Sequence, residues 1–414
     1  MTSTNSSIDQ CTPVIPHRTV FAIAVFAIFV CATFATAQAP SSSLYKPWMI
    51  GPFTQVDSAN PVLGPNFDSL FFCPIRKENI RWEARAILGA AAIVKDGQLD
   101  LIYHAEDSSS GFKRNEIYLS PGTMRMGFAS SSDGLHFKRE NQPVLYPDNG
   151  PLKDAEWPGG NEIPRIVEGP DKTYYLYYSS WNHTITRLSV ATSKDLLHWT
   201  KQGLVFAKAN GGKYHQLWSK SGAVITEVKE GRLVAAKIKG KYWMYFGEGN
   251  MHVATSDNLI DWTPVEVAPG QKNSPADSDS AYDRKSSEWP DILNIQYPRR
   301  NMFDSALIEG GVAVLTAKGI VHIYNSSDAD SPESATWKKE NRLYYSVGQA
   351  LFSSDDPTKL LDRSDAAFLK PESDFEKQGV SPNVVFLTGI AWYHGKWMLY
   401  YNGADWMVGV ATTP

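Results

Sequence analysis

The alternation of apolar and polar residues predicts β-strands that come in pairs along most of the chain. Five segments share one form: an apolar strand, a turn with a glycine or a charged residue, and an aromatic strand. These segments are residues 91–107, 164–181, 234–249, 313–328 and 390–405. Each is therefore expected to form a two-stranded hairpin.

The hairpins recur at a regular spacing of 68 to 79 residues between turns, which indicates a repeated unit. Their turns lie near Gly97, Lys172, Gly240, Gly319 and Gly395. A third strand, a Ser-Asp turn and the start of a fourth strand follow in residues 124–137, 186–199 and 250–262. The repeated unit is thus predicted to contain four strands.

The last copy stops at residues 406–414, after its third strand. Residues 60–66 (NPVLGPN) resemble residues 142–149 (QPVLYPDN), which follow the third strand of the first copy. We therefore expect residues 60–66 to complete the last unit. Because no segment keeps a helical period, the sequence predicts an all-β, five-bladed β-propeller closed by this N-terminal strand. The polar, proline-rich residues 269–302 are predicted to be a loop between blades.

The N-terminus resembles a secretory signal peptide. An apolar stretch ends in Ala35-Thr36-Ala37, a small-x-small cleavage site, so cleavage after Ala37 is expected. An uncleaved membrane anchor is the alternative. The predicted organisation is a signal peptide (1–37), an extension (38–59) and the propeller domain (60–414), in a protein that is secreted or periplasmic and has no stable membrane partner once cleaved. Cleavage would leave Cys73 as the one cysteine.

Composition narrows the function. A formal net charge of −4, without a basic run, argues against a nucleic-acid-binding protein. The 13 Trp and 19 Tyr residues suit either sugar-stacking surfaces or a β-rich core. Motifs for zinc, calcium, a serine nucleophile or a phosphate-binding loop do not occur, and no cofactor is expected.

The sequence WPGGNEIPRIVE, at the entry to the second unit, presents the best candidate for chemistry. Pro164 is expected to hold the residues before it extended and so to aim Glu162. The first strand of a propeller blade lines the central channel, so a side chain here would face the funnel. The alternative is that Glu162 simply pairs with Arg165.

These motifs resemble glycoside hydrolase family 130, the β-mannoside phosphorylases and β-mannosidases. The resemblance covers about residues 60–412 and rests on FFCP with RWEARAILGAAAIVKDG, WPGGNEIPRIVE, WSKSGAV, FDSALIEGG and the closing NVVFLTGIAWYHGKWMLYYNGADWMVGVAT. It implies a five-bladed propeller that acts on β-linked oligosaccharides. The polar positions that match the family are Glu162, Arg165, Lys220, Asp304, Glu309 and Asp405.

The departures from the family pattern bear on mechanism. The resemblance places the family's proton-donating Asp at Ile163, a second Asp at Ala86 and a sugar-binding Asn at Gly89. Gly247 and Leu307 stand where phosphate-binding side chains are expected, which leaves Lys220 alone. A phosphate dianion is best held by several charge-assisted donors, so the pattern favours water as the acceptor.

The sequence therefore predicts inverting hydrolysis of β-linked, mannose-like oligosaccharides. Glu162 is the predicted proton donor, with Glu309 as the base and Asp304 as the second choice for it. The residues expected to bind substrate are Arg165, Lys220, Asp405, Trp157, Trp181 and Trp406. The alternatives are a sugar-binding propeller with impaired catalysis and a β-mannoside phosphorylase.

Overall fold

The computed structural model describes residues 44–108, 122–270, 273, 289–329 and 344–414. Within these ranges the regular structure is almost entirely β-strand, which confirms the predicted all-β class. The helices are short: α1 (Lys153–Glu156), α3 (Asp374–Lys377) and the 3-10 helix η1 (Ala209–Gly212). The predicted signal peptide lies outside the described residues.

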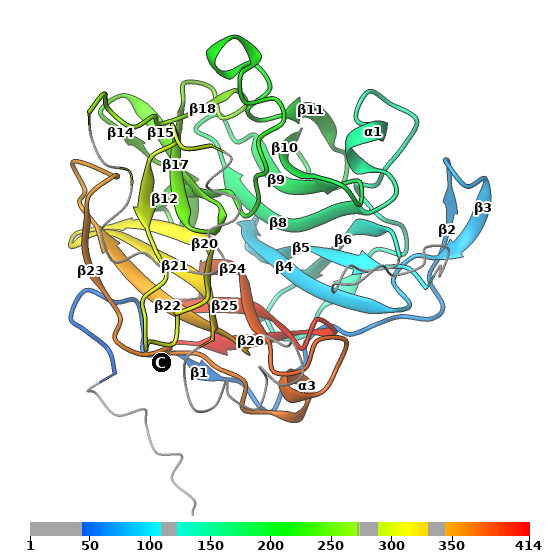
Figure 1. Cartoon of the computed structure of the whole chain (residues 1–414). Helices are drawn as coiled ribbons and strands as arrows, with labels where there is room; N and C mark the ends of the chain where they lie inside the picture. Colours follow the sequence, from blue (N-terminus) through cyan, green and yellow to red (C-terminus); the bar gives the residue numbers. More distant parts are fainter. Residues whose placement is uncertain (1–43, 109–121, 271–272, 274–288, 330–343) are drawn as a thin grey trace, which may run out of the picture. The chain divides into compact units, whose positions relative to one another are not determined.

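Antiparallel pairing groups the strands into successive meanders, as the hairpin pattern predicts (Figure 1). The first contains β4 (Ala86–Lys95), β5 (Gln98–Glu106), β6 (Met124–Ser131) and β7 (Lys138–Arg139). The second contains β8 (Gly160–Glu168), β9 (Tyr174–Trp181), β10 (Thr186–Ser193) and β11 (Thr200–Leu204). The fourth contains β20 (Leu307–Thr316), β21 (Gly319–Asp328), β22 (Tyr344–Phe352) and β23 (Leu360–Arg363).

The third meander differs from the predicted hairpin 234–249. Its first strand is β12 (Ala223–Lys229), which pairs with β15 (Lys241–Phe246), and β17 (Met251–Ser256) and β18 (Trp262–Pro264) follow. The predicted first strand is split into β13 (Arg232–Ala235) and β14 (Lys237–Ile238) because β13 folds back on β12. A short strand, β19 (Asn294–Gln296), pairs with β17 of this meander, whereas β16 (Glu248–Gly249) pairs with β20 of the fourth. β19 lies in the predicted loop 269–302, much of which is outside the described residues.

The last sheet combines both ends of the described chain. β24 (Val385–Tyr393), β25 (Lys396–Gly403) and β26 (Met407–Thr412) form a meander, and β1 (Thr54–Gln55) pairs with β26. Leu63 makes a bridge to Val408 further along the same strand. The regular strand thus lies upstream of the predicted residues 60–66, which contribute this single bridge.

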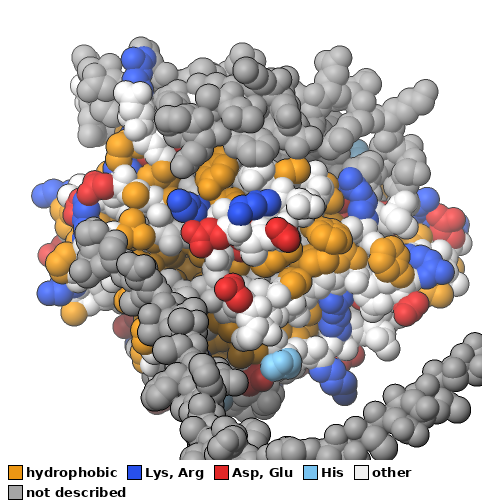
Figure 2. Space-filling model, turned by 90° about the horizontal axis from the view of Figure 1, so that it is seen from below, with side chains coloured by type: hydrophobic (Ala, Val, Ile, Leu, Met, Phe, Trp, Pro, Cys, Tyr) orange, Lys and Arg blue, Asp and Glu red, His pale blue; other side chains and the backbone are white. Residues whose placement is uncertain are grey.

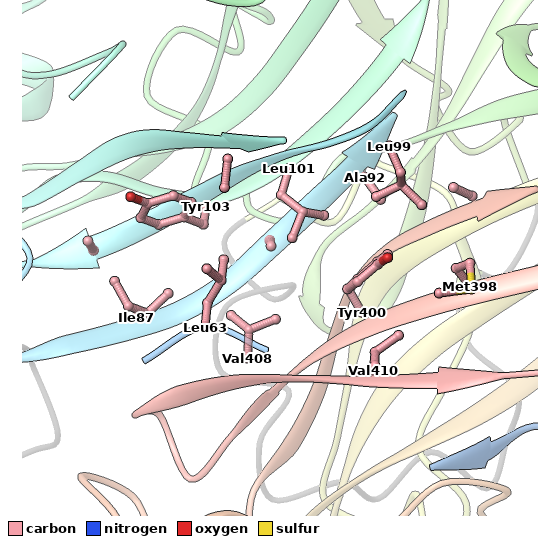
Figure 3. Packing of buried hydrophobic residues seen from close by; sticks show 14 of the residues in the cluster. Leu63, Ile87, Ala92, Leu99, Leu101, Tyr103, Met398, Tyr400, Val408 and Val410 are labelled. Carbon is pink, nitrogen blue, oxygen red and sulfur yellow. The ribbon is translucent and has the colours of Figure 1, made fainter. Parts of the chain in front are cut away.

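Buried side chains join the first sheet to the last (Figure 3). Leu101 and Tyr103 of β5 belong to one cluster with Tyr400 of β25 and Val408 of β26, and all four are fully buried. Leu63 packs into the same cluster. Each such side chain contributes roughly 1.5–3 kcal/mol by leaving water, so this contact fixes the N-terminal segment in place. A separate hairpin, β2 (Leu70–Cys73) with β3 (Glu78–Arg81), precedes the first meander.

The first strands of all the meanders meet around one cavity of about 30 Å³. β4, β8, β12, β20 and β24 supply its lining, with residues such as Ala91, Arg165, Ala223, Gly311 and Thr388. Neighbouring strands of this set contact each other, β4 with β8 and β24, and β20 with β12 and β24. Side chains at the ends of these strands are thereby brought together from distant parts of the sequence.

The surface is mixed in character. Figure 2 shows acidic and basic side chains interspersed with apolar ones on the face it presents. Among the residues that the structure describes, no helix is both long and apolar enough to cross a membrane.

Candidate active site

Two glutamates lie directly before β-bulges in strands that line the cavity. The antiparallel register shifts between Glu162 and Arg165 in β8 and between Glu309 and Val312 in β20. The strands β4 and β24 shift register in the same way. A bulge bends its strand and redirects the neighbouring side chains, and bulges are common beside active sites. Four of the strands that line the cavity therefore contain a β-bulge, and in two of them a glutamate precedes the bulge.

The bulge in β8 is strained. Ile163 is buried and has a φ of 50°, in the left-handed region that a β-branched residue rarely adopts. The expectation that Pro164 keeps Ile163 extended is therefore wrong. Such a conformation costs on the order of 1–3 kcal/mol and persists only where the surrounding structure imposes it. Glu162 is aimed by this imposed turn rather than by an extended segment.

Glu162 is a carboxylic acid poised to hold a proton near neutral pH. Burial raises its pKa to about 7, and Lys220 opposes this shift while Glu106, Glu248 and Glu309 add to it. A pKa near the working pH is what a general acid requires.

Lys220 lies between the other carboxylates. Its Nζ is 3.2 Å from Glu248 Oε1 and 3.6 Å from Glu309 Oε1. Burial alone would lower the pKa of Lys220, but the attraction of Glu248, Glu309 and Glu162 outweighs it and raises the pKa. Glu162, Lys220, Glu248 and Glu309 are hereafter the Lys220 cluster.

Glu309 is held by two donors that favour its charged form. The Ser221 hydroxyl donates to Glu309 Oε1 at 2.5 Å, and Lys220 approaches the same oxygen. Burial raises the pKa of Glu309, and both donors counter that effect. Glu248 faces Glu309 directly in the β16–β20 pairing. This arrangement suits a carboxylate that accepts a proton from water, as the sequence predicts for Glu309.

Asp405, in the turn between β25 and β26, interacts electrostatically with Lys220 of this cluster. Ala404 and Asp405 both have φ near 50° (50° and 51°), and Asn402 Nδ2 donates to Asp405 Oδ1 at 2.5 Å. Burial raises the pKa of Asp405, and Lys220 is among the groups that oppose it. Burial likewise raises the pKa of Tyr345, with Glu309 and Glu248 adding to the effect. Asp405 and Tyr345 therefore border the Lys220 cluster.

Arg165 has a structural role. Its guanidinium donates to the backbone carbonyls of Gly311 (2.7 Å), Gly310 (2.8 Å), Leu387 (3.2 Å) and Pro164 (3.0 Å). These bonds tie β8 to β20 and β24. Burial lowers the pKa of Arg165 to about 10. Its contacts support neither the alternative pairing with Glu162 nor the predicted contact with substrate.

Asp304 is fully buried in a different cluster. Arg299 Nη2 lies 3.0 Å from Asp304 Oδ2, Arg363 also donates to that oxygen, and the Tyr324 hydroxyl donates to it at 2.8 Å. Two guanidinium groups hold this carboxylate, so its contacts argue against the predicted role as an alternative base. Arg299, Asp304, Tyr324 and Arg363 are hereafter the Asp304 cluster.

The three predicted tryptophans separate in the structure. Trp157 packs against the core cluster of the first and last sheets, and Trp406 packs against a small cluster with Ala86 and Leu88. Trp157 and Trp406 thus pack against hydrophobic clusters, and these contacts do not support the predicted stacking of either ring on a sugar. Trp181 instead meets Trp218, with ring centroids 6.1 Å apart and planes at 68°.

Five residues in or around the Lys220 cluster were not predicted from the sequence: Glu106, Trp218, Ser221, Glu248 and Tyr345. Trp218 Nε1 donates to Glu248 Oε2 at 3.0 Å. Trp218 and Ser221 flank Lys220 in the WSKSGAV motif, so that motif carried a usable signal. Glu248 follows the strand KYWMYF, where nothing in a single sequence marks it out.

The positions where the family resemblance expects polar side chains are tightly enclosed. A Cβ added at Gly89 would lie 2.6 Å from Thr388 Cγ2, and one at Gly247 would lie 2.3 Å from the Asn250 carbonyl oxygen. Ala86 and Leu307 are buried. Among the described residues, His, Cys, Asp and Glu form no group that could hold a metal ion.

Comparisons with known proteins identify the family. A family model for glycoside hydrolase family 130, described as beta-1,4-mannooligosaccharide phosphorylase, matches residues 112–414. A 1,2-beta-oligomannan phosphorylase from a Thermoanaerobacter species is 31% identical over 340 residues, which are 81% of this chain and 92% of that protein.

Solved structures give a similar result. A glycosyl hydrolase from Bacteroides ovatus has a TM-score of 0.78 and 39% identity, covering 89% of this chain and 96% of its own. Another, with a TM-score of 0.78, 38% identity and the same coverage, comes from work on glycoside hydrolases of the GH130 family that target beta-1,2 mannosidic linkages in Candida mannan. The chain therefore belongs to glycoside hydrolase family 130.

Proposed function

We propose that the protein cleaves β-mannosidic bonds in oligosaccharides and uses water as the acceptor. The observation that carries this proposal is the Lys220 cluster, in which the Lys220 ammonium group pairs with Glu248 and Glu309 and also acts electrostatically on Glu162. Inverting hydrolysis needs one protonated acid and one ionised base on opposite sides of the sugar. Glu162, with its pKa raised to about 7, supplies the acid, and Glu309 supplies the base.

The charge of the site favours water over phosphate. Lys220 is already engaged by Glu248 and Glu309, so a phosphate dianion would meet carboxylates at close range. Like charges at such distances cost energy, and a dianion needs several donors to compensate. The backbone at Gly247 is so closely surrounded that it leaves no room for a side chain at this position. These observations support hydrolysis.

Phosphorolysis is the second candidate, and the names of the curated relatives favour it over hydrolysis. They are a 1,2-beta-oligomannan phosphorylase and a beta-1,2-mannobiose phosphorylase. A related structure from the same family, at 38% identity, is associated with hydrolases of beta-1,2 linkages. We accordingly propose β-1,2-linked mannosides as the first substrates to test, and β-1,4-linked ones second.

The deciding experiment measures products with and without inorganic phosphate. Purified protein is given β-1,2- and β-1,4-mannobiose, and sugars are separated from sugar phosphates. Hydrolysis predicts free mannose at a rate independent of phosphate. Mannose 1-phosphate that forms only with phosphate would establish the phosphorylase. Binding without any cleavage would establish a sugar-binding protein with impaired catalysis.

We further propose that the five meanders are blades of a propeller and that the protein is exported. The cavity lined by the five first strands supports the first point, and β1 and Leu63 beside β26 support closure by the N-terminal segment. Export rests on the sequence of residues 1–37 alone. An experimental structure tests the fold, and N-terminal sequencing of mature protein tests cleavage after Ala37.

A further inference from the structure

A pair of tryptophans lies beside the Lys220 cluster. Trp181 ends β9 and is buried, whereas Trp218 precedes β12 and is partly exposed. Their rings meet edge to face at 6.1 Å. Neither ring belongs to the hydrophobic core clusters of the described residues, in contrast to Trp157 and Trp406. The position of the partly exposed Trp218 is therefore not explained by packing in those clusters.

The backbone holds Trp218 in a fixed position. The Ser219 amide donates to the Thr186 carbonyl at 3.1 Å, and the Leu188 amide donates to Ser219 Oγ at 3.0 Å. Thr186 is the direct partner of Trp181 in the β9–β10 pairing. The segment that carries Trp218 is thus fastened to the strand that neighbours Trp181, which keeps the two rings in register.

Hydrogen bonding also fixes the orientation of the Trp218 ring. Its Nε1 donates to Glu248 Oε2 at 3.0 Å, and Glu248 Oε1 in turn accepts from Lys220 at 3.2 Å. The polar edge of the indole therefore points to the Lys220 cluster. A rigid, amphipathic aromatic ring offers a large contact area at a low entropic cost. A sugar ring has the matching shape, with an apolar C–H face and hydroxyls at its edge.

We propose that Trp181 and Trp218 form a sugar-binding subsite next to the bond that is cleaved. The Trp218 ring receives the C–H face of a hexose, and Glu248 and Lys220 accept from and donate to its hydroxyls. The ligand class is a neutral oligosaccharide of at least two units, so that one unit lies on each side of the cleaved bond. This inference rests on the proposed function.

The experiment uses full-length protein with Glu162→Gln, so that the sugar is not consumed. Calorimetry measures binding of β-1,2-mannotriose with Trp218 intact, with Trp218→Leu and with Trp218→Phe. The expected result is about tenfold weaker binding for Trp218→Leu. Trp218→Phe, which keeps a flat ring without the N–H donor, is expected to stay within about threefold.

Trp392→Leu serves as the matched control. Trp392 is also partly exposed and also meets a second tryptophan edge to face, Trp397 at 5.2 Å, but it lies at the far end of β24. Its binding should equal that of the parent. In the protein with Glu162 restored, Trp218→Leu should raise KM far more than it lowers kcat, as expected for lost substrate binding.

The outcomes separate the two proposals. Unchanged mannotriose binding in Trp218→Leu overturns the subsite and leaves the proposed function standing. Equal losses in Trp218→Phe and Trp218→Leu also overturn it, because the N–H bond to Glu248 would then matter rather than the ring. If the parent binds no mannoside at all, both proposals fall.

Discussion

The Lys220 cluster and the Asp304 cluster are both groups of acids and bases, yet their balance of charge is opposite, and the Lys220 cluster is partly exposed whereas Asp304 is fully buried. In the first, two glutamates pair with one ammonium group, which also acts electrostatically on Glu162. In the second, one carboxylate receives two guanidinium groups and a phenol. Both Glu309 and Asp304 lie at the start of the fourth meander, within the same FDSALIEGG motif.

The difference in charge balance between the two clusters bears on which acid can take part in proton transfer. A carboxylate that accepts bonds from two guanidinium groups is held firmly in one position. Acids that outnumber their cation repel one another, and burial then favours the neutral form of one of them. The contacts therefore favour Glu162 over Asp304 as the residue that takes part in proton transfer, the role proposed above for Glu162.

Replacing the acid of the Lys220 cluster should give the largest effect. Glu162→Gln keeps the shape of the side chain and removes the proton, so kcat on mannobiose should fall by roughly 10²–10⁴. Steady-state kinetics on protein with an unchanged unfolding midpoint provides the measurement. A rate close to that of the parent would mean that Glu162 is not the general acid.

The matching change in the Asp304 cluster should act on stability. Asp304→Asn leaves two arginines without their carboxylate, and breaking a buried ion pair costs about 3–5 kcal/mol. Denaturant titration should show this loss in the free energy of unfolding, while the folded fraction keeps most of its kcat. A large loss of kcat without a loss of stability would reverse the assignment.

The pH dependence tests the same contrast more finely. The acid must be protonated to act, and the pKa of Glu162 is raised to about 7. The rate should therefore be full below this value and fall about tenfold per unit above it. A profile of kcat/KM between pH 5 and pH 9 checks this sign. A rate that rises through pH 7 would contradict it.

Removing the cation should move that profile by a smaller amount. Lys220 lowers the pKa of Glu162, so Lys220→Met should shift the alkaline limb to higher pH, by about one unit. Lys213→Met is a suitable control, because Lys213 pairs with Glu266 and Asp291 at the surface. The control should leave the limb in place. An unchanged limb in Lys220→Met would show that Lys220 does not act on Glu162, and a shift to lower pH would contradict the sign of its effect.

Local pattern was sufficient for much of the fold. Alternation of apolar and polar residues, together with the turn residues, predicted the hairpins, and the spacing of the hairpins predicted the repeat. The NPVLGPN segment was predicted to join the last unit, and its Leu63 makes a bridge to that sheet. The exception is the third meander, where AVITEVK supplies the first strand in place of residues 234–238. A single sequence cannot choose between two such strands, since the choice depends on which one pairs with β15 and β20.

The site shows the same division between local and tertiary information. Sequence alone determined that Glu162, Lys220, Glu309 and Asp405 occupy strand ends and turns of different repeats. Their roles were decided by neighbours from other parts of the chain. Arg165 met the carbonyls of β20 and β24, and Asp304 met Arg363, 59 residues away.

Proton chemistry is the clearest case of what the tertiary structure alone decided. The pKa of a carboxyl in the interior depends on how many charges surround it and how far water is excluded, and for Glu162 those charges come from three other meanders. Glu248 and Trp218 were not predicted from the sequence to belong to the site. They join it only because β16 pairs with β20 in the folded chain. Sequence placed the acids along the strands; folding determined which of them can hold a proton.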